Sequence, residues 1–433
     1  MRRGIVLAGL LVAWLPALAG AAAGTDRWLA SWAASPQQAM PGPQGDVPDL
    51  SGRTLRQRVR LTAGGTRLRL RLSNEYGAAP LSIGAVTIAA PASAADGAAP
   101  ANAAAPGAED VRAGSVRALT FGGRASVVIP PGAPVLSDPV EFEAPRGRDV
   151  IISVYFPSDA KAVTLHSVGL STAVISPPGD FTHDAHAEAA STTTARLLLS
   201  AVLVPAAKDA IGIVALGDSI TDGTRSSVDA NRRWPDVLAR RFAAQADARS
   251  RVRGGAVGIA NEGISGNRLL ADGAGASALA RLDRDVLALP GVTHVIVLIG
   301  INDIGWPGAK WGERFLEDPA RAPALDDLAA AYRQIIDRVH GHGAKVIGAT
   351  LTPFEGTDLP GYYSTQKESL RQTVNRWIRN GGAFDGVIDF DAALRDPAHP
   401  AAALPGYMSD DHIHPSDAGY DAMGQAVALE LFR

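Results

Sequence analysis

Five short apolar runs, each followed by a segment of helical spacing, fill the second half of this 433-residue chain. The apolar runs are residues 211–216, 257–260, 294–299, 345–350 and 386–390. The helical segments are residues 234–246, 276–289, 325–340, 366–379 and 416–431. Short runs that are apolar throughout are typical of strands buried on both faces. Their alternation with helices predicts a mostly parallel sheet with helices on both sides, a three-layer α/β/α domain over residues 207–433.

The first half of the chain has the period of β structure. Leu68, Leu70 and Leu72 alternate with arginines, which indicates a half-buried strand. Further strand candidates lie at residues 127–129, 150–156 and 197–204, with Gly- and Pro-containing turns between them. Many short strands with such turns predict a β-sandwich domain, jelly-roll-like, over residues 24–206.

The first residues have the pattern of a targeting segment. Arg2 and Arg3 precede an apolar stretch at residues 5–18, and small residues follow up to position 23. We therefore expect a signal peptide over residues 1–23, and a secreted or periplasmic protein. The apolar stretch is short and contains Pro16, and no later segment is long and apolar enough to cross a bilayer. Stable membrane insertion is not expected.

Composition excludes several classes of chemistry. The chain has no cysteine, so neither disulfides nor thiol catalysis are available. The 41 basic and 44 acidic residues give a net charge of −3, without a basic block that could neutralise phosphates. This balance argues against nucleic acid as a partner.

Polar segments follow the predicted strands. They are residues 217–223, 261–267 and 300–303, and a fourth, residues 410–415, precedes the last helical segment. Ligands of parallel sheets bind at the carboxyl ends of the strands. We therefore expect the chemistry of the chain at this edge of the sheet.

In order and spacing, these four segments resemble the four blocks of the SGNH hydrolase superfamily, the GDSL-type esterases and lipases. The motifs are Gly-Asp-Ser at 217–219, Gly-Ile-Ser-Gly-Asn at 263–267, Gly-Ile-Asn-Asp at 300–303 and Asp-x-x-His at 411–414. The resemblance covers about residues 211–433. The β half is similar to the accessory region of secreted two-domain members, through residues 28–32 and 73–77. The resemblance implies a flavodoxin-like fold and a serine carboxylic-ester hydrolase.

The resemblance assigns a nucleophile, a base and an acid. A serine hydroxyl needs a general base to attack at neutral pH. Ser219 lies where a strand turns into a helix, and taken alone it would be read as a helix N-cap. With the other three segments present, it is the expected nucleophile. His414 is the expected base, and Asp411 would orient its imidazole. His412 is the alternative base, but the Asp-x-x-His spacing from Asp411 selects His414. Asp410 is expected to be a surface or capping carboxylate.

The resemblance also implies three oxyanion-hole donors: the backbone N–H groups of Ser219 and Gly266 and the side-chain amide of Asn302. Glycine suits a loop in which the backbone approaches a substrate closely. Gly263 is the competing glycine, and Asn302 could instead be a structural turn residue. Trp306 and Trp311 are each expected either to line an acyl or sugar pocket or to cap the core.

We expect neither a metal nor another cofactor. His412 and His414 with Asp410 and Asp411 could suggest a metal site, but no distant third ligand is evident. In the β half, His166, His183 and His186 are expected to be structural or surface residues.

The substrate class stays open among several alternatives. One is a short-acyl or O-acetyl ester, including esters on carbohydrates, so that a small molecule or a polysaccharide is the partner. Another is a lipid or aryl ester, as for a lysophospholipase or arylesterase. The same residues could also transfer an acyl group to a sugar, and a non-catalytic carbohydrate-binding protein is an alternative of another class. The sequence carries no signal for the oligomeric state.

Overall fold

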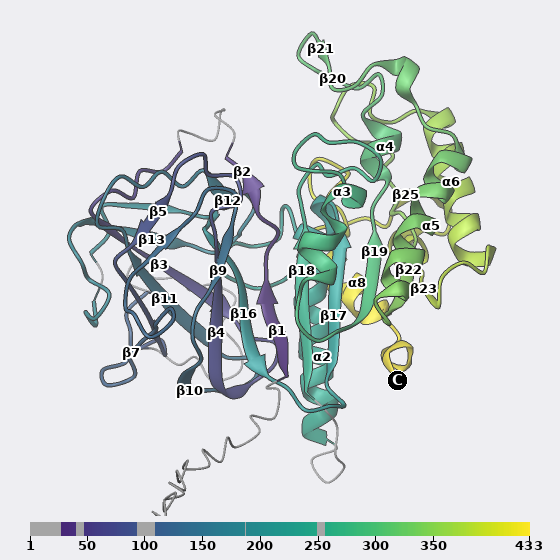
Figure 1. Cartoon of the computed structure of the whole chain (residues 1–433). Coiled ribbons are helices and arrows are strands. Elements are labelled where there is room, and N and C mark those ends of the chain that lie inside the picture. The colour runs from purple at the N-terminus through teal and green to yellow at the C-terminus, as the bar shows by residue number, and fades with distance from the viewer. Residues whose placement is uncertain (1–26, 40–46, 93–108, 187, 249–255) are drawn as a thin grey trace, which may run out of the picture.

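The computed structural model describes residues 27–39, 47–92, 109–186, 188–248 and 256–433 (Figure 1). The expected signal peptide, residues 1–23, lies outside these residues. Within the described part of the chain, no helix combines the length and apolarity needed to cross a membrane.

The N-terminal half is built from antiparallel strands in two main sheets (Figure 1). One sheet has the order β1 (Trp28–Ala33), β16 (Leu199–Pro205), β4 (Gly65–Ser73) and β10 (Val140–Ala144), and β9 (Pro134–Leu136) also pairs with β4. The other has the order β14 (Ser191–Thr193), β13 (Ala173–Pro178), β3 (Arg53–Arg60), β11 (Asp149–Tyr155), β6 (Ala85–Ala89) and β7 (Arg117–Ala118). Smaller sheets join β15 (Arg196–Leu197), β12 (Thr164–His166) and β2 (Gln37–Gln38), and β5 (Leu81–Ile83) with β8 (Val127–Ile129).

The two main β sheets share one hydrophobic core. Leu68, Leu70 and Leu72 of β4 are buried, as the alternation in the sequence predicted. They belong to the same cluster as Val150 and Ile152 of β11, which lies in the other sheet. The β-rich nature of this half is therefore confirmed, whereas its jelly-roll connectivity stays a prediction.

The C-terminal half contains a five-stranded sheet in which every pairing is parallel. Its order is β18 (Val257–Gly263), β17 (Ile211–Gly217), β19 (Val292–Leu298), β22 (Lys345–Ala349) and β23 (Gly386–Ile388). Counted along the chain, these strands stand in the order 2-1-3-4-5 of flavodoxin-like sheets. All five apolar runs of the sequence therefore became strands of one sheet.

Helices connect and cover the parallel strands. They are α1 (Ser219–Asp222), α2 (Trp234–Ala248), α3 (Ala278–Leu282), α4 (Ile301–Gly305), α5 (Leu325–Gly341), α6 (Thr365–Asn380), α7 (Phe390–Leu394) and α8 (Asp417–Ala426). Two hairpins, β20 (Lys310–Trp311) with β21 (Arg314–Phe315) and β24 (Arg395–Asp396) with β25 (His399–Ala403), interrupt this pattern.

Two predicted helices are shorter than expected. The segment 276–289 forms α3 and then a π-helical turn, Asp283–Leu287. The segment 416–431 ends as an α-helix at Ala426 because Val427 adopts an extended backbone, and a 3₁₀ turn, Leu429–Phe432, follows. This turn brings Phe432 edge-on to the rings of Phe242 and His294.

The two halves pack directly against each other through β1 and β18. A Cβ at Gly258 would lie 2.4 Å from the Ala30 carbonyl oxygen, so only glycine permits this approach. Thr62 adds a hydrogen bond, accepting from the Ile259 backbone N–H at 2.8 Å. Ala30 also belongs to the same hydrophobic cluster as Val214 of β17. The apolar core of the parallel sheet thus continues into the β half.

Candidate active site

Ser219 is the first residue of α1, immediately after the end of β17. The side chain of Asp218, not that of Ser219, caps this helix: its Oδ1 accepts a hydrogen bond from the Ile220 N–H at 3.0 Å. The Ser219 hydroxyl is therefore not used as a cap. The Ser219 N–H, at the first position of the helix, has no intrahelical acceptor.

The Ser219 hydroxyl contacts His414, although the two residues lie far apart in the chain. His414 Nε2 is 2.9 Å from Ser219 Oγ, and His414 Nδ1 is 2.8 Å from Asp411 Oδ2. An ionised carboxylate only accepts, so Nδ1 carries the proton and donates it to Asp411. The Nε2 lone pair is then left to accept the hydroxyl proton of Ser219.

The Asp411 carboxylate is fixed by the turn that carries His414. Its Oδ1 accepts from Ser409 Oγ at 2.8 Å, from the Ile413 N–H at 3.1 Å and from the His414 N–H at 3.0 Å. Burial alone would raise the pKa of Asp411, but the hydrogen bond and charge of His414, with the backbone donors, lower it well below its usual value of 3.8. Asp411 is therefore a carboxylate at any pH near neutrality.

The alternative base and acid lie outside this contact. His412 is exposed, has a left-handed backbone with a φ of 54°, and lies against Gly356. Asp410 is also exposed. The structure thus brings together Ser219, Asp411 and His414 and leaves His412 and Asp410 aside. Within the described residues, no group of three or more His, Asp or Glu side chains could hold a metal ion.

Gly266 lies in a tight turn beyond the end of β18. The turn is closed by the Asn267 N–H, which donates to the Ile264 carbonyl at 3.0 Å. Gly266 has a φ of 75°, and a Cβ there would lie 2.9 Å from Ala274 Cβ. Its N–H meets no acceptor in the described part of the chain, whereas the Gly263 N–H donates to Asn261 Oδ1 at 2.9 Å. Of the two glycines, Gly266 is the one with an N–H available to a ligand.

Asn302, on α4, has its amide orientation set by three hydrogen bonds. Its Oδ1 accepts from Trp306 Nε1 at 3.0 Å and from the Tyr362 hydroxyl at 2.8 Å. Its Nδ2 donates to the Asn267 carbonyl at 2.9 Å. Because an amide nitrogen carries two protons, one N–H remains for another acceptor. Trp306, which could have lined a pocket or capped the core, binds the oxygen of this amide.

The segments that carry these donors follow three neighbouring strands. Gly217, at the end of β17, pairs with Gly263 of β18 on one side and with Leu298 of β19 on the other. The Ile264 N–H also donates to the Gly217 carbonyl at 3.1 Å. Parallel strands thus deliver Ser219, the Gly266 turn and α4 to one edge of the sheet, as expected for such sheets.

A buried arginine that the sequence did not single out ties these segments together. The Arg281 guanidinium, inaccessible to solvent, donates to the Gly217 carbonyl at 2.9 Å and to Asn267 Oδ1 at 3.0 Å. It also donates to the Glu262 carbonyl and to Ser35 Oγ in the β half, both at 2.7 Å. No local motif marks this role, since the partners come from four different places in the sequence.

Two carboxylic acids beneath the site anchor its loops. Asp303 accepts from the Leu269 and Leu270 N–H groups at 2.7 and 2.9 Å, and Asp218 caps α1. Burial raises the pKa of Asp218 to about 7, and the nearby charges of Asp303 and Asp222 raise it further toward that value. Burial also raises the pKa of Asp303, to about 6.

A match to a family model identifies the part of the chain that carries these residues. The model of the GDSL-like lipase/acylhydrolase family matches residues 215–422. This part of the chain belongs to that family. The match starts in β17, ends in α8, and therefore includes all four polar segments of the acylhydrolase. It lies within the residues 211–433 over which the motifs indicated the resemblance.

Solved structures similar to this chain include a carbohydrate acetylesterase from Sinorhizobium meliloti, at 16% identity and a TM-score of 0.36, covering 51% of this chain and 96% of that one. Another is an acetylxylan esterase from Geobacillus stearothermophilus, at 20% identity and a TM-score of 0.37, covering 52% and 94%. A third is an α/β hydrolase enzyme from the metagenome of Lake Arreo, Spain, at 20% identity and a TM-score of 0.37, covering 51% and 94%. No curated protein matches the chain.

Proposed function

We propose that this protein is a serine carboxylic-ester hydrolase that forms an acyl-enzyme on Ser219. One observation carries the proposal: the continuous contact from Ser219 Oγ through His414 to Asp411, at 2.9 and 2.8 Å. It gives a serine hydroxyl both a base and an orienting acid, which is what a serine nucleophile needs. Membership of residues 215–422 in an acylhydrolase family supports the same chemistry.

In the first half of the reaction, Ser219 Oγ attacks the ester carbonyl carbon and its proton moves to His414 Nε2. The Asp411 carboxylate stabilises the imidazolium that results. The carbonyl oxygen becomes an oxyanion, for which the N–H groups of Ser219, Gly266 and Asn302 are the proposed donors. The C–O bond to the alcohol then breaks, and the proton on Nε2 passes to the departing alcohol oxygen.

The second half repeats these steps with water. His414 Nε2 takes a proton from a water molecule, whose oxygen attacks the acyl carbon held on Ser219. The second tetrahedral intermediate collapses, the proton returns to Ser219 Oγ, and a carboxylic acid leaves. An acyl transferase would use the same groups with a sugar hydroxyl in place of water.

A short acyl group is the substrate we favour. Ser219 is only 4% exposed, so neighbouring groups cover most of the nucleophile. Lipases that bind long chains usually need an apolar surface near the site. The exposed large apolar side chains of the described residues are Val128, Leu136, Val228, Leu270, Trp311 and Phe315, and none of them lies in a helix. An apolar lid helix is therefore not among the described elements.

A carbohydrate is our proposed carrier of the acyl group. Trp311, 71% exposed, lies on the hairpin of β20 and β21, which projects beyond α4 in Figure 1. Because α4 carries Asn302, the hairpin lies on the same side of the molecule as the site. An exposed indole offers a flat apolar face with a polar N–H, which suits binding of a sugar ring.

Covalent labelling tests the nucleophile. A fluorophosphonate probe should modify the wild-type protein, and mass spectrometry of the digested protein should place the label on Ser219. The Ser219→Ala variant should stay unlabelled. A label on another residue, or no label on the folded wild type, would contradict the proposal.

A series of p-nitrophenyl esters tests the acyl preference. We expect kcat/KM to be highest for acetate, lower for butyrate and lowest for octanoate. A rise toward octanoate would instead favour the lipid-ester alternative.

A further inference from the structure

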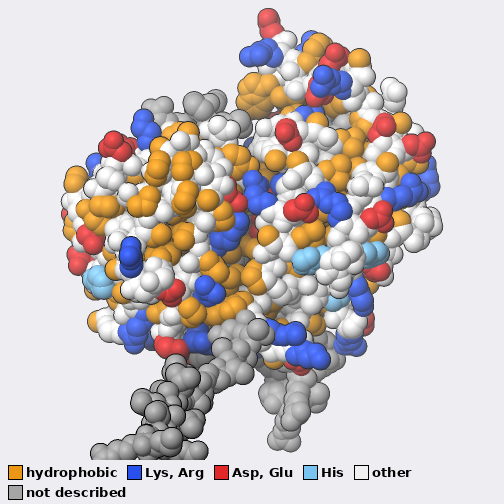
Figure 2. All heavy atoms as spheres, viewed as in Figure 1, with side chains coloured by type: hydrophobic (Ala, Val, Ile, Leu, Met, Phe, Trp, Pro, Cys, Tyr) orange, Lys and Arg blue, Asp and Glu red, His pale blue; other side chains and the backbone are white. Residues whose placement is uncertain are grey.

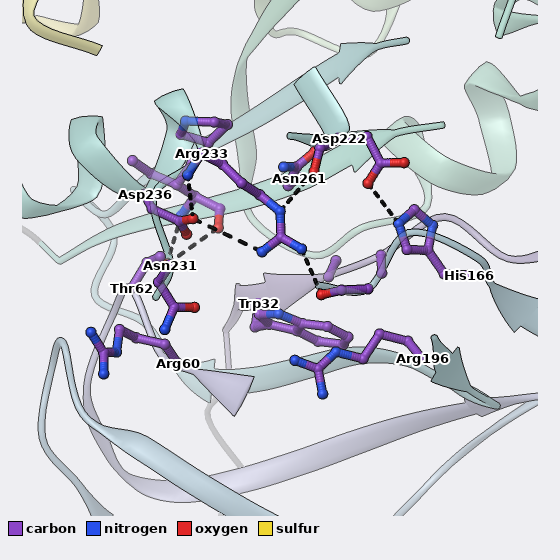
Figure 3. Close-up of a pocket in the computed structure, with 15 residues that line it drawn as sticks. Trp32, Arg60, Thr62, His166, Arg196, Asp222, Asn231, Arg233, Asp236 and Asn261 are labelled. Carbon is purple, nitrogen blue, oxygen red and sulfur yellow. Dashed lines mark hydrogen bonds and ion pairs between the residues drawn. The ribbon is translucent and has the colours of Figure 1, made fainter. Parts of the chain in front are cut away.

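A small polar cavity lies at the contact between the two halves (Figure 3). It has a volume of about 40 Å³, and its walls include Trp32 and His166 from the β half and Asp222 and Asn261 from the acylhydrolase half. Asp222 is the last residue of α1, the helix that begins with Ser219. The cavity wall therefore reaches the element that carries the proposed nucleophile.

His166, at the end of β12, is bound at both ring nitrogens. Its Nε2 lies 2.8 Å from Asp222 Oδ1, as Figure 3 shows, and its Nδ1 lies 3.1 Å from the Ser35 carbonyl oxygen. His166 is 5% exposed and Asp222 2% exposed. Water does not compete for such a contact, so it is strong, and loss of either partner leaves a buried polar group unsatisfied.

The second oxygen of the same carboxylate holds the turn that carries Gly266. Asp222 Oδ2 accepts from the Ser265 N–H at 2.9 Å, and Ser265 directly precedes Gly266. The Asp222 carboxylate therefore bridges a side chain of the β half and the backbone N–H that directly precedes Gly266, a proposed oxyanion donor. A rotation of this carboxylate would release the Ser265 N–H and loosen the turn.

We propose that His166 is a positioning residue for the oxyanion hole, acting through Asp222 on the turn of Ser265 and Gly266. The inference rests on the proposed ester hydrolase function. In this account the β half contributes to catalysis, because its His166 holds the Gly266 donor in place from outside the acylhydrolase fold. A displacement of about 1 Å in such a group can cost about 10²-fold in rate.

Two variants of His166 that differ by one methylene separate this role from general interface packing. His166→Gln can place its amide nitrogen where Nε2 lies and keep the bond to Asp222. His166→Asn is too short to reach Asp222 but can still donate to the Ser35 carbonyl. Thr62→Val is the matched interface control, because it removes the hydrogen bond to Ile259 across the same cavity and does not touch Asp222.

The first readout is hydrolysis of p-nitrophenyl acetate. For His166→Asn we expect kcat to fall by about tenfold to 10²-fold with KM changed less than about threefold. His166→Gln should recover most of kcat. Thr62→Val should retain wild-type kcat even if its Tm falls as far as that of His166→Asn. Wild-type kcat in folded His166→Asn, or an equal loss in Thr62→Val, would overturn the inference.

The second readout does not depend on turnover. Hydrogen exchange of the peptide that covers residues 264–267 should accelerate in His166→Asn and stay near wild type in His166→Gln and Thr62→Val. Unchanged exchange in His166→Asn would overturn the inference even in an active enzyme. If the wild type did not hydrolyse esters, the proposed function would fail, while the exchange result would still decide whether His166 holds the turn.

Discussion

Arg225 donates a hydrogen bond from Nε to Asp411 Oδ2 at 3.1 Å, and the same oxygen accepts from His414 Nδ1 at 2.8 Å. The carboxylate that orients the imidazole is thus itself held by a cation from the loop after α1. Arg225, which makes this contact, has a left-handed backbone with a φ of 72°. Non-glycine residues adopt that conformation rarely, which points to a local requirement.

Replacing Arg225 should therefore slow the reaction modestly. In Arg225→Met we expect kcat to fall by about 3- to 10-fold, because a half-exposed charged hydrogen bond contributes about 1 kcal/mol. KM for p-nitrophenyl acetate should change little. Arg232→Met is a suitable control, since Arg232 forms a similar exposed ion pair with Asp417. Equal rates for both variants would show that the Asp411 contact has no effect on the reaction.

Loss of the Asn302 amide should have a larger effect. In Asn302→Ala we expect kcat to fall by about 10²–10³, the loss typical of one oxyanion donor. Tyr362→Phe removes only one of the bonds that orient the amide, so its kcat should fall much less. Steady-state kinetics on the two folded variants would check this order. Similar losses in both would mean that Asn302 acts through packing.

The buried Arg281 should be critical for stability. In Arg281→Met we expect the free energy of unfolding to fall by about 3–5 kcal/mol, because several buried acceptors lose their donor. Arg284→Met should cost less, since Arg284 is partly exposed and Asp285 keeps its contact with Arg281. Denaturant unfolding measures both. A smaller loss in Arg281→Met than in Arg284→Met would contradict the role assigned to Arg281.

Asp218 should make stability depend on pH in a defined direction. Its pKa is about 7 in the folded protein, mainly because of burial, against an ordinary value of 3.8. Between these values the folded chain holds a proton that the unfolded chain has lost, so the free energy of unfolding falls as pH rises, by at most about 1.4 kcal/mol per pH unit. Below pH 4 both states are protonated, and above pH 7 both are ionised.

Asp218→Asn removes this titration but keeps an oxygen to cap α1. Its Tm relative to the wild type should therefore rise steadily between pH 4 and pH 7 and level off beyond. Thermal unfolding at several pH values tests this. Parallel Tm curves for the two proteins would mean that Asp218 ionises as easily when folded as when unfolded.

The sequence predicted those features that depend on local period and on motif order. The alternation at Leu68, Leu70 and Leu72 predicted β4, and the five apolar runs predicted the parallel sheet. The order of the four polar segments predicted that Ser219 and His414 lie near each other. The division of the chain at residue 206, the jelly-roll connectivity and secretion stay predictions.

The contacts that the sequence did not reveal join distant residues. His166, expected to be structural or on the surface, is buried and lies 56 positions from Asp222. Ser35 and Arg281 are 246 positions apart. The spacing of apolar residues along the sequence does not predict such pairs, because they form only when the two halves pack together. The early end of α8 was missed for a related reason, since tertiary packing of Phe432 favours the turn over continued helix.

Hydrolysis of p-nitrophenyl acetate by the wild type and by Ser219→Ala tests the central claim most directly. We expect steady release of p-nitrophenol by the wild type and a loss of about 10⁴-fold or more in a Ser219→Ala protein of unchanged Tm. Turnover retained in the folded Ser219→Ala variant would contradict an acyl-enzyme on Ser219.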